Sequence, residues 1–168
     1  TLSIASSTSS FDTKDVGVGK TVTISGITLG GADAGNYNLV STTAAPTTAD
    51  ITPKVLTISG SSAANKVYDG TQTATVTAGT LSGLIGVETL TVNAAGVFDT
   101  KDVGTNKNVT ASYTLTDGTN GGVASNYSLA DETLLADISK KSLEVQANDD
   151  SKTYNGSTYF GGNGVTYI

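Results

Sequence analysis

A chain of 168 residues can hold one or two small domains, but only 37% of the residues are apolar and ten are aromatic, so any single core must be thin. Cysteine and histidine are absent, which excludes disulfides, thiol or imidazole catalysis and the zinc sites that need these side chains. A net charge of −6 opposes nucleic-acid binding, and no apolar run is long enough for a membrane span.

The pattern of apolar residues predicts β-strands along the whole chain. Apolar side chains alternate with Thr or Ser at 21–25 and 109–116, and with Ser, Glu and Gln at 142–147. A period of two places one face of a strand in a core and the other in water. Turn signals separate the strands. They are Asp69-Gly70, Asp117-Gly118, Gly121-Gly122, Asn155-Gly156 and Gly161-Gly162.

A tandem repeat organises these strands. The segment Phe11-Asp-Thr-Lys-Asp-Val-Gly17 recurs as Phe98-Asp-Thr-Lys-Asp-Val-Gly104, an offset of 87 residues. Further echoes keep the same order, with a loop three residues longer in the first copy. They pair Asn36-Tyr37-Asn38-Leu39 with Asn126-Tyr127-Ser128-Leu129, Ala49-Asp50-Ile51 with Ala136-Asp137-Ile138, Lys54-Val-Leu56 with Lys141-Ser-Leu143, and Lys66-Val-Tyr68-Asp69-Gly70 with Lys152-Thr-Tyr154-Asn155-Gly156.

The repeat divides the chain into three parts. Residues 51–137 form one complete unit, residues 1–50 the C-terminal part of a preceding unit, and residues 138–168 the N-terminal part of a following one. Several short strands in about 87 residues predict an all-β fold of tandem immunoglobulin-like antiparallel β-sandwiches. A β-solenoid is the rival fold, but it needs a period of about 20–30 residues, which is not seen inside the unit. The short joints, with Pro53 in the first, favour a semi-rigid array.

These motifs carry a family resemblance over essentially the whole chain. The succession Phe-Asp-x-Lys-x-Val-Gly, Asn-Tyr-x-Leu, Ala-Asp-Ile-x-x-Lys-x-Leu and Lys-x-Tyr-Asp-Gly-Thr resembles the YDG repeat domain, also grouped with the mostly bacterial immunoglobulin-like (MBG) domains. The resemblance implies a surface-exposed or secreted bacterial adhesin, similar to filamentous haemagglutinins exported by two-partner secretion. The naming motif is Tyr68-Asp69-Gly70 in one copy and Tyr154-Asn155-Gly156 in the next.

The signature residues are expected to be structural. Asp69-Gly70 and Asn155-Gly156 are expected to form turns in which the Asx side chain caps backbone N–H groups, with Tyr68 and Tyr154 packed on a sheet. Tyr37 and Tyr127 are expected to act as tyrosine corners, in which the ring is buried and the hydroxyl bonds to backbone.

Four carboxylates suggest a calcium hypothesis, because oxygen ligands near loop ends stiffen many extracellular arrays. The spacing fits neither the EF-hand nor the Gly-rich calcium repeat, and a lysine lies inside each aspartate pair, so a solvated charge cluster is favoured and no cofactor is expected. The four candidates are Asp12, Asp15, Asp99 and Asp102.

Three functions follow from the sequence, and none is enzymatic, because phosphate loops, Ser-centred elbows and carboxylate dyads are not found. The first is a stalk or spacer whose partners are neighbouring repeats. The second is a direct module for host or cell-surface glycans or proteins. The third is the subunit of an extracellular filament completed by strand exchange, because residues 138–168 followed by residues 1–50 of another chain nearly make one unit.

Overall fold

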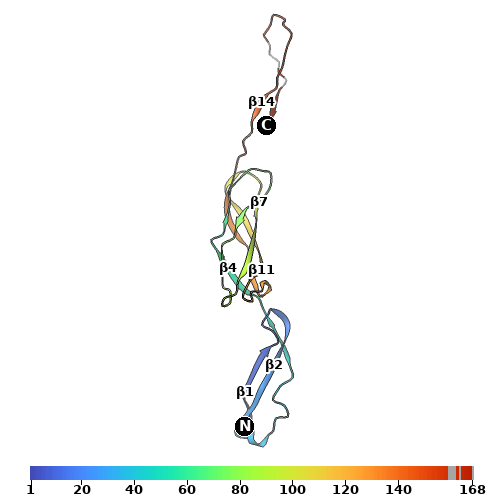
Figure 1. Ribbon diagram of the computed structural model, residues 1–168, viewed down its shortest axis with the longest axis vertical. Coiled ribbons are helices and arrows are strands. Elements are labelled where there is room, and N and C mark those ends of the chain that lie inside the picture. Colours follow the sequence, from blue (N-terminus) through green and yellow to red (C-terminus); the bar gives the residue numbers. More distant parts are fainter. Residues whose placement is uncertain (159–161, 163, 168) are drawn as a thin grey trace. The chain divides into compact units, whose positions relative to one another are not determined.

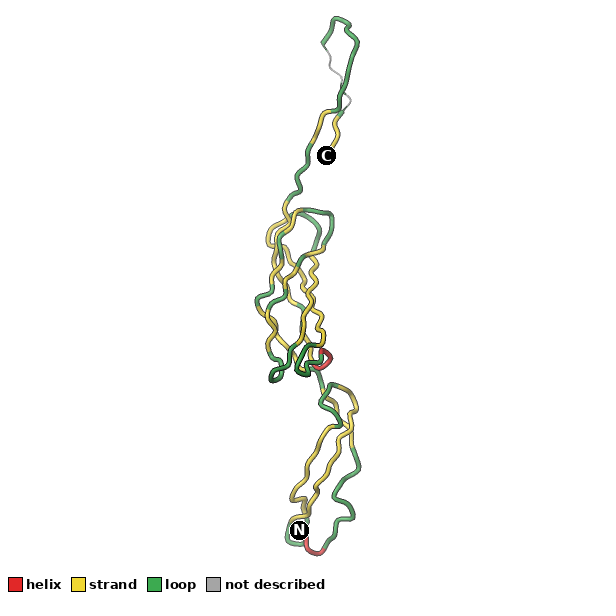
Figure 2. Tube along the Cα trace, viewed as in Figure 1, coloured by secondary structure: helices red, strands yellow, loops and turns green. Residues whose placement is uncertain are grey.

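The computed structural model describes residues 1–158, 162 and 164–167. These residues form strands and loops, with helix only in two short 3-10 turns, so the predicted all-β class is confirmed (Figure 2). Among them no helix is long and apolar enough to cross a membrane. The high content of Thr and Val, whose branched side chains suit a pleated surface, explains the preference for strands.

The elements follow one another at short intervals along the chain (Figure 1). In chain order they are β1 (Ser3–Phe11), β2 (Gly17–Gly30), η1 (Ala34–Asn36), β3 (Thr47–Ile51), β4 (Lys54–Ser59), β5 (Ser62–Ala63), β6 (Lys66–Val67), β7 (Thr73–Ala74), β8 (Val76–Thr77), β9 (Thr80–Ser82), β10 (Leu90–Phe98), β11 (Gly104–Asp117), η2 (Ala124–Asn126), β12 (Tyr127–Leu129), β13 (Glu132–Ser139), β14 (Val145–Ala147) and β15 (Val165–Tyr167).

The chain divides into two compact units. The first unit comprises Thr1–Ser61, Ala78–Ala94 and Ser112–Asp131. It contains an antiparallel sheet in the order β1-β2-β3 and a second sheet in the order β12-β4-β9. Leu56 on β4 and Tyr127 on β12 are its buried side chains. Because β12 begins at Tyr127, the pairing of β12 with β4 holds this tyrosine at the start of a strand.

The second unit comprises Ser62–Thr77, Ala95–Ala111 and Glu132–Ile168. Its sheet has the order β6-β13-β11-β10-β7. One face of this sheet carries the core, against which Tyr68, Leu134, Val76 and Ala63 pack. The core residues are Ala74, Phe98, Val109, Ala136 and Ile138.

Strand pairing confirms the predicted alternation at 109–116 but corrects two expectations. Within β11, Val109 and Ala111 are fully buried while their neighbours are exposed. The pairs β12 with β4 and β13 with β6 run parallel, so the expectation of purely antiparallel sheets was wrong. Both parallel pairs join segments far apart in the sequence, which a hairpin cannot do. At 142–147, β14 forms over only three residues and all of them are exposed.

The turns lie where Gly and Asx residues predicted them. Gly70, Gly121 and Gly156 have positive φ values of 79°, 85° and 71°, a conformation that glycine adopts without steric cost. Gly161 of the predicted Gly161-Gly162 turn lies outside the described residues.

A β-bulge at equivalent positions of the two copies explains the repeated Ala-Asp-Ile motif. The register between β2 and β3 shifts between Gly17 and Lys20, and the register between β11 and β13 shifts 87 residues later. The bulged residue has positive φ in both, 65° at Gly19 and 51° at Asn106. Its N–H donates to the aspartate of the motif, at 2.8 Å in each copy. Asp50 and Asp137 are these two acceptors.

Candidate functional site

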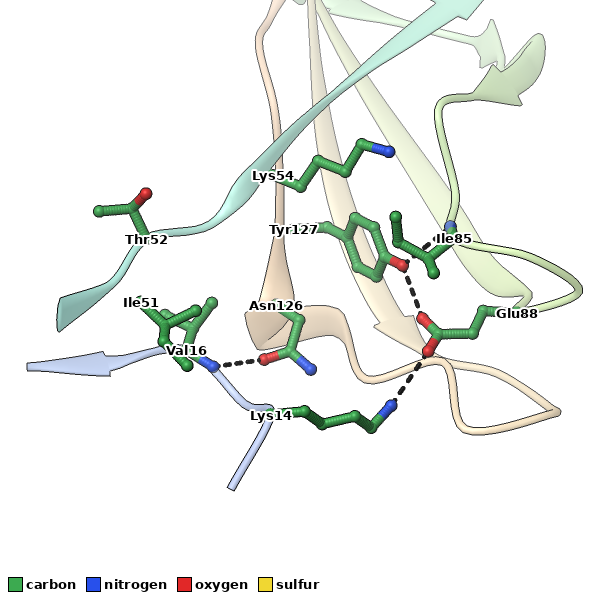
Figure 3. A pocket seen from close by; sticks show the side chains of 9 residues that line it. All are labelled: Lys14, Val16, Ile51, Thr52, Lys54, Ile85, Glu88, Asn126 and Tyr127. Carbon is green, nitrogen blue, oxygen red and sulfur yellow. Dashed lines mark hydrogen bonds and ion pairs between the residues drawn. The ribbon is translucent and has the colours of Figure 1, made fainter. Parts of the chain in front are cut away.

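The first unit contains a cluster of polar contacts between the loop after β1 and the loops around Glu88 and Asn126. We call it the junction cluster. It comprises Lys14, Asp15, Val16, Ile85, Glu88, Asn126 and Tyr127. Figure 3 shows these side chains, apart from Asp15, converging from the turn after β1, the segment before β10 and the start of β12. Residues about 70–110 positions apart in sequence thus meet within one unit.

The Asn126 side chain uses both ends of its amide. Its Nδ2 donates to Asp15 Oδ1 at 2.9 Å, and its Oδ1 accepts from the Val16 backbone N–H at 2.8 Å. Asn126 is the last residue of η2, and the Tyr127 N–H that follows bonds to the Ala124 carbonyl. This short turn fixes the amide at the loop surface. An amide that donates and accepts at once is specific for orientation, because a carboxylate offers no donor.

A chain of charged hydrogen bonds runs from Lys14 through Glu88 to Tyr127. Lys14 Nζ lies 3.1 Å from Glu88 Oε1, and the Tyr127 hydroxyl donates to Glu88 Oε2 at 2.6 Å. The same hydroxyl accepts from the Ile85 N–H at 3.2 Å. The Tyr127 hydrogen bond and then the Lys14 ammonium lower the pKa of Glu88, while Glu88 raises the pKa values of Lys14 and Tyr127. Lys14 and Glu88 thus stabilise each other's charged form, and the Tyr127 hydroxyl further stabilises the Glu88 carboxylate.

A cavity of about 290 Å³ lies beside the cluster and is lined by the nine residues drawn in Figure 3. Its walls combine the apolar side chains of Val16, Ile51 and Ile85 with the paired charges of Lys14 and Glu88. Because Glu88 already bonds to a hydroxyl and an ammonium, it is held as an anion rather than poised to take a proton. The geometry suits holding two loops together.

The four aspartates of the calcium hypothesis lie at separate positions and have partners of different kinds. Asp12 bonds to the Thr13 N–H and lies 3.3 Å from Lys20, and Asp99 bonds to the Thr100 N–H and lies 2.9 Å from Lys107. The Thr13 N–H lowers the pKa of Asp12, and Lys107 lowers that of Asp99. Asp15 accepts from the Asn126 amide, and Asp102 is exposed. In the described ranges, no three acidic side chains converge as a metal site would require.

The Tyr-Asp-Gly signature forms a turn organised by a lysine. Asp69 Oδ1 accepts from the Thr71 N–H at 2.8 Å, and Gly70 takes the left-handed conformation. Lys66 Nζ bonds to Asp69 at 2.9 Å and to the Thr71 carbonyl at 2.8 Å. The bond from Lys66, and then the bonds from Thr71, lower the pKa of Asp69 to about 2. Lys66 also lies 5.5 Å from the centre of the Phe98 ring. Tyr68 packs against the core.

The second signature forms the same turn in another setting. Asn155 Oδ1 accepts from the Ser157 N–H at 3.2 Å, Gly156 has positive φ, and Lys152 Nζ bonds to the Ser157 carbonyl at 2.6 Å. Tyr154 is 91% exposed, in contrast to Tyr68. The two expected tyrosine corners differ likewise, because Tyr127 is 7% exposed and Tyr37 is 57% exposed.

Sequence reasoning missed the junction cluster as a unit. Asn126 and Tyr127 stand out because Asn36-Tyr37 repeats them, and Asp15 stands out as a charged loop residue. Glu88 carries no such signal, since the residue 87 positions earlier is Thr1. What the sequence could not indicate is that the repeated Lys-Asp-Val loop of one copy contacts the Asn-Tyr turn of the next.

Comparison with known families finds a match. The family model described as the YDG domain matches residues 1–45 and 52–134, which is most of the chain. No curated protein and no solved structure matches. The two matched segments correspond to the two copies that carry the Phe-Asp-Thr-Lys-Asp-Val-Gly motif.

Proposed function

The chain belongs to the YDG domain family, and we propose that it is a structural spacer, a piece of the stalk of a secreted or surface-attached bacterial adhesin. Its partners in that role are neighbouring repeats. Its mechanism is the docking of each repeat onto the next, so that bending at the joint meets a free-energy cost. The proposed location is the extracellular face of a bacterium.

The junction cluster is the observation that carries this proposal. Lys14, Asp15 and Val16 belong to the repeated loop of the first copy, whereas Glu88 and Asn126 belong to the complete repeat. Two repeats joined only by a flexible linker would not contact each other in this way. Solvent weakens the ion pair of the mostly exposed Lys14 with Glu88, whereas the two bonds of the Asn126 amide are partly buried and less screened. These bonds join the two copies at a second place besides the chain connection, so bending at the joint must stretch or break them.

We further propose that each repeat is an immunoglobulin-like sandwich, with one complete unit at residues 51–137 and partial units at 1–50 and 138–168. Support comes from the five-stranded sheet with its buried face, and from the bulge that recurs 87 residues apart. In MBG-type arrays such units would follow one another along the stalk.

The experiment compares Asn126→Ala with Asn36→Ala by NMR relaxation of backbone amides. Asn126 bridges Asp15 and Val16, whereas Asn36 holds the equivalent place in the other copy and makes no side-chain bond among those described. In the parent protein, amides of β1–β2 and of β4 should share one rotational correlation time. In Asn126→Ala the β1–β2 amides should tumble faster, because the clamp on the loop is lost. Asn36→Ala should behave like the parent.

Independent tumbling of β1–β2 and β4 in the parent would contradict the spacer mechanism. A second measurement addresses the direct binding module. If the parent chain bound a defined sugar on a glycan array, and the binding survived Asn126→Ala, ligand recognition rather than spacing would be the better account of the function.

A further inference from the structure

The junction cluster contains two side-chain pairs of different chemistry. We call Lys14, Asp15 and Val16 the docking loop. In the first pair, Lys14 Nζ lies 3.1 Å from Glu88 Oε1, so a cation meets a carboxylate. In the second pair, Asp15 Oδ1 accepts from the Asn126 amide at 2.9 Å, so a carboxylate meets a neutral donor. The same amide accepts from the Val16 N–H at 2.8 Å.

The complete repeat positions its own side of both pairs. We call Glu88, Asn126 and Tyr127 the receiving site. Glu88 Oε2 accepts from the Tyr127 hydroxyl at 2.6 Å, and that hydroxyl accepts from the Ile85 N–H. The Tyr127 ring is buried, and Asn126 ends the 3-10 turn directly before it. One buried tyrosine therefore positions both the carboxylate and the amide. Groups that are held in place lose little conformational entropy when a partner binds.

The two pairs make the order of residues in the docking loop important. The Tyr127 hydroxyl and then Lys14 lower the pKa of Glu88, whereas the nearby negative charge of Asp15 acts against both. A loop with aspartate before lysine would place a second carboxylate beside Glu88. It would also place an ammonium, which offers only donors, beside the donor of Asn126. Repelling charges and unpaired donors are physical means by which an interface rejects a wrong partner.

We propose that the receiving site selects the repeat that docks on it, and that it fits a loop with the residues Lys-Asp-Val in this order. This specificity rests on the docking of repeats described above as the spacer mechanism. The ion pair selects the charge of the first residue. The Asn126 amide selects the register, because it bonds to a carboxylate and to the next backbone N–H at once. Both copies carry such a loop, at residues 14–16 and 101–103.

Hydrogen exchange of the Val16 amide in the full chain reports docking, because this N–H donates to Asn126 when the loop is docked. The amide should be protected in the parent, and Asn126→Ala should lower its protection at least about tenfold. An unprotected Val16 amide in the parent would contradict docking itself, and with it the spacer mechanism. If Val16 is protected in the parent and exposed in Asn126→Ala, docking stands and the variants below test specificity alone.

A reversal of two loop residues changes their order without changing the net charge. The double variant Lys14→Asp with Asp15→Lys should lower the protection of Val16 at least about tenfold. The same reversal at Lys101 and Asp102, in the identical loop of the complete repeat, is the matched control and should leave Val16 protected. Protection of Val16 at the parent level in the first variant would overturn the proposal.

A compensating pair of substitutions distinguishes recognition from damage to the fold. Asn126→Asp brings two carboxylates together and should lower the protection of Val16. Adding Asp15→Asn supplies an amide donor from the other side, while the new carboxylate can still accept from the Val16 N–H. Protection should then return to within about threefold of the parent. A double variant no better protected than Asn126→Asp would count against recognition by this pair.

The lysine pair has a separate signature in its response to salt. Lys14 is 68% exposed, so its attraction to Glu88 is screened as the ionic strength rises. Between about 0.01 M and about 1 M NaCl, protection of Val16 should fall in the parent and rise in Lys14→Glu, where salt screens a repulsion. Lys14→Arg should behave like the parent. The same salt response in the parent and in Lys14→Glu would rule out Glu88 as the residue that selects charge.

Discussion

The two copies of the repeat differ in burial far more than in backbone geometry. Phe11 and Phe98 end equivalent strands, and the bulges after them have the same register shift and the same aspartate bond. Only Phe98 is enclosed. A strand pair and its bulge are thus set by contacts within about 50 residues of sequence, whereas the core around Phe98 also includes Ala74 and has Tyr68 packed against it. Local structure can form before, and without, the burial that stabilises it.

The largest expected effect is on the core of the complete repeat. Phe98→Ala should lower the free energy of unfolding by about 3–5 kcal/mol, because it opens a cavity among Val109, Ile138 and their neighbours. Phe11→Ala should lower it by less than about 1 kcal/mol, because the Phe11 side chain is 41% exposed. Urea unfolding followed by circular dichroism measures both. Equal losses in the two variants would mean that the copies are equally packed.

A smaller effect is expected at the bulge, where the copies are alike. Gly19 and Asn106 have positive φ, and a Cβ at Gly19 would meet no atom within 4 Å, so only backbone strain opposes substitution. Gly19→Ala and Asn106→Ala should each cost about 1 kcal/mol. Asn106→Gly should stay within about 0.5 kcal/mol of the parent. Thermal unfolding compares the three, and a neutral Asn106→Ala would argue against the left-handed bulge.

The stability of the Asp69 turn should depend on pH, whereas the equivalent turn has the uncharged Asn155 and should not. The pKa of Asp69 is lowered from 3.8 to about 2 by Lys66 and Thr71, so between these values the unfolded chain binds more protons than the folded one. The stabilisation is complete above the unfolded value and is lost as the pH falls toward about 2. Asp69→Asn copies the uncharged Asn155 of the other turn and should flatten this part of the curve.

Urea midpoints measured between about pH 6 and pH 2 test this difference. The lowered pKa of Glu88 acts in the same direction, because it also favours the folded chain above its ordinary value of 4.5. The junction variant Glu88→Gln should therefore flatten the curve independently of Asp69→Asn. A profile that both variants leave unchanged would exclude these two carboxylates as the source.

The smallest effect is expected from calcium. Asp12 in the first copy and Asp99 in the second each form an ion pair with a lysine, and Asp15 accepts a hydrogen bond from the Asn126 amide. Millimolar calcium should leave the melting temperature unchanged, because binding to the folded chain alone would raise it. If calcium raised the melting temperature and Asp102→Asn abolished the rise, the original calcium hypothesis would stand at that loop.

By itself the sequence determined the elements that depend on near neighbours. The all-β class, the strand at 109–116 and the repeated loops followed from period-two patterns and Gly or Asx residues. The YDG resemblance followed from the order of the motifs, and the family match bears it out. The strand periodicity at 142–147 indicated burial that does not occur, because a pattern shows which face could be buried and not whether another segment covers it.

Only the tertiary structure decided which copies of a motif are packed and what they touch. Tyr127 is enclosed and Tyr37 is not, although both follow an Asn on a 3-10 turn. Residues 70 or more positions apart meet in the parallel pairs β6 with β13 and β12 with β4, and in the contact of Lys14 with Glu88. Such contacts depend on how distant segments return to one place, and the free energy of that return is not encoded in any local pattern.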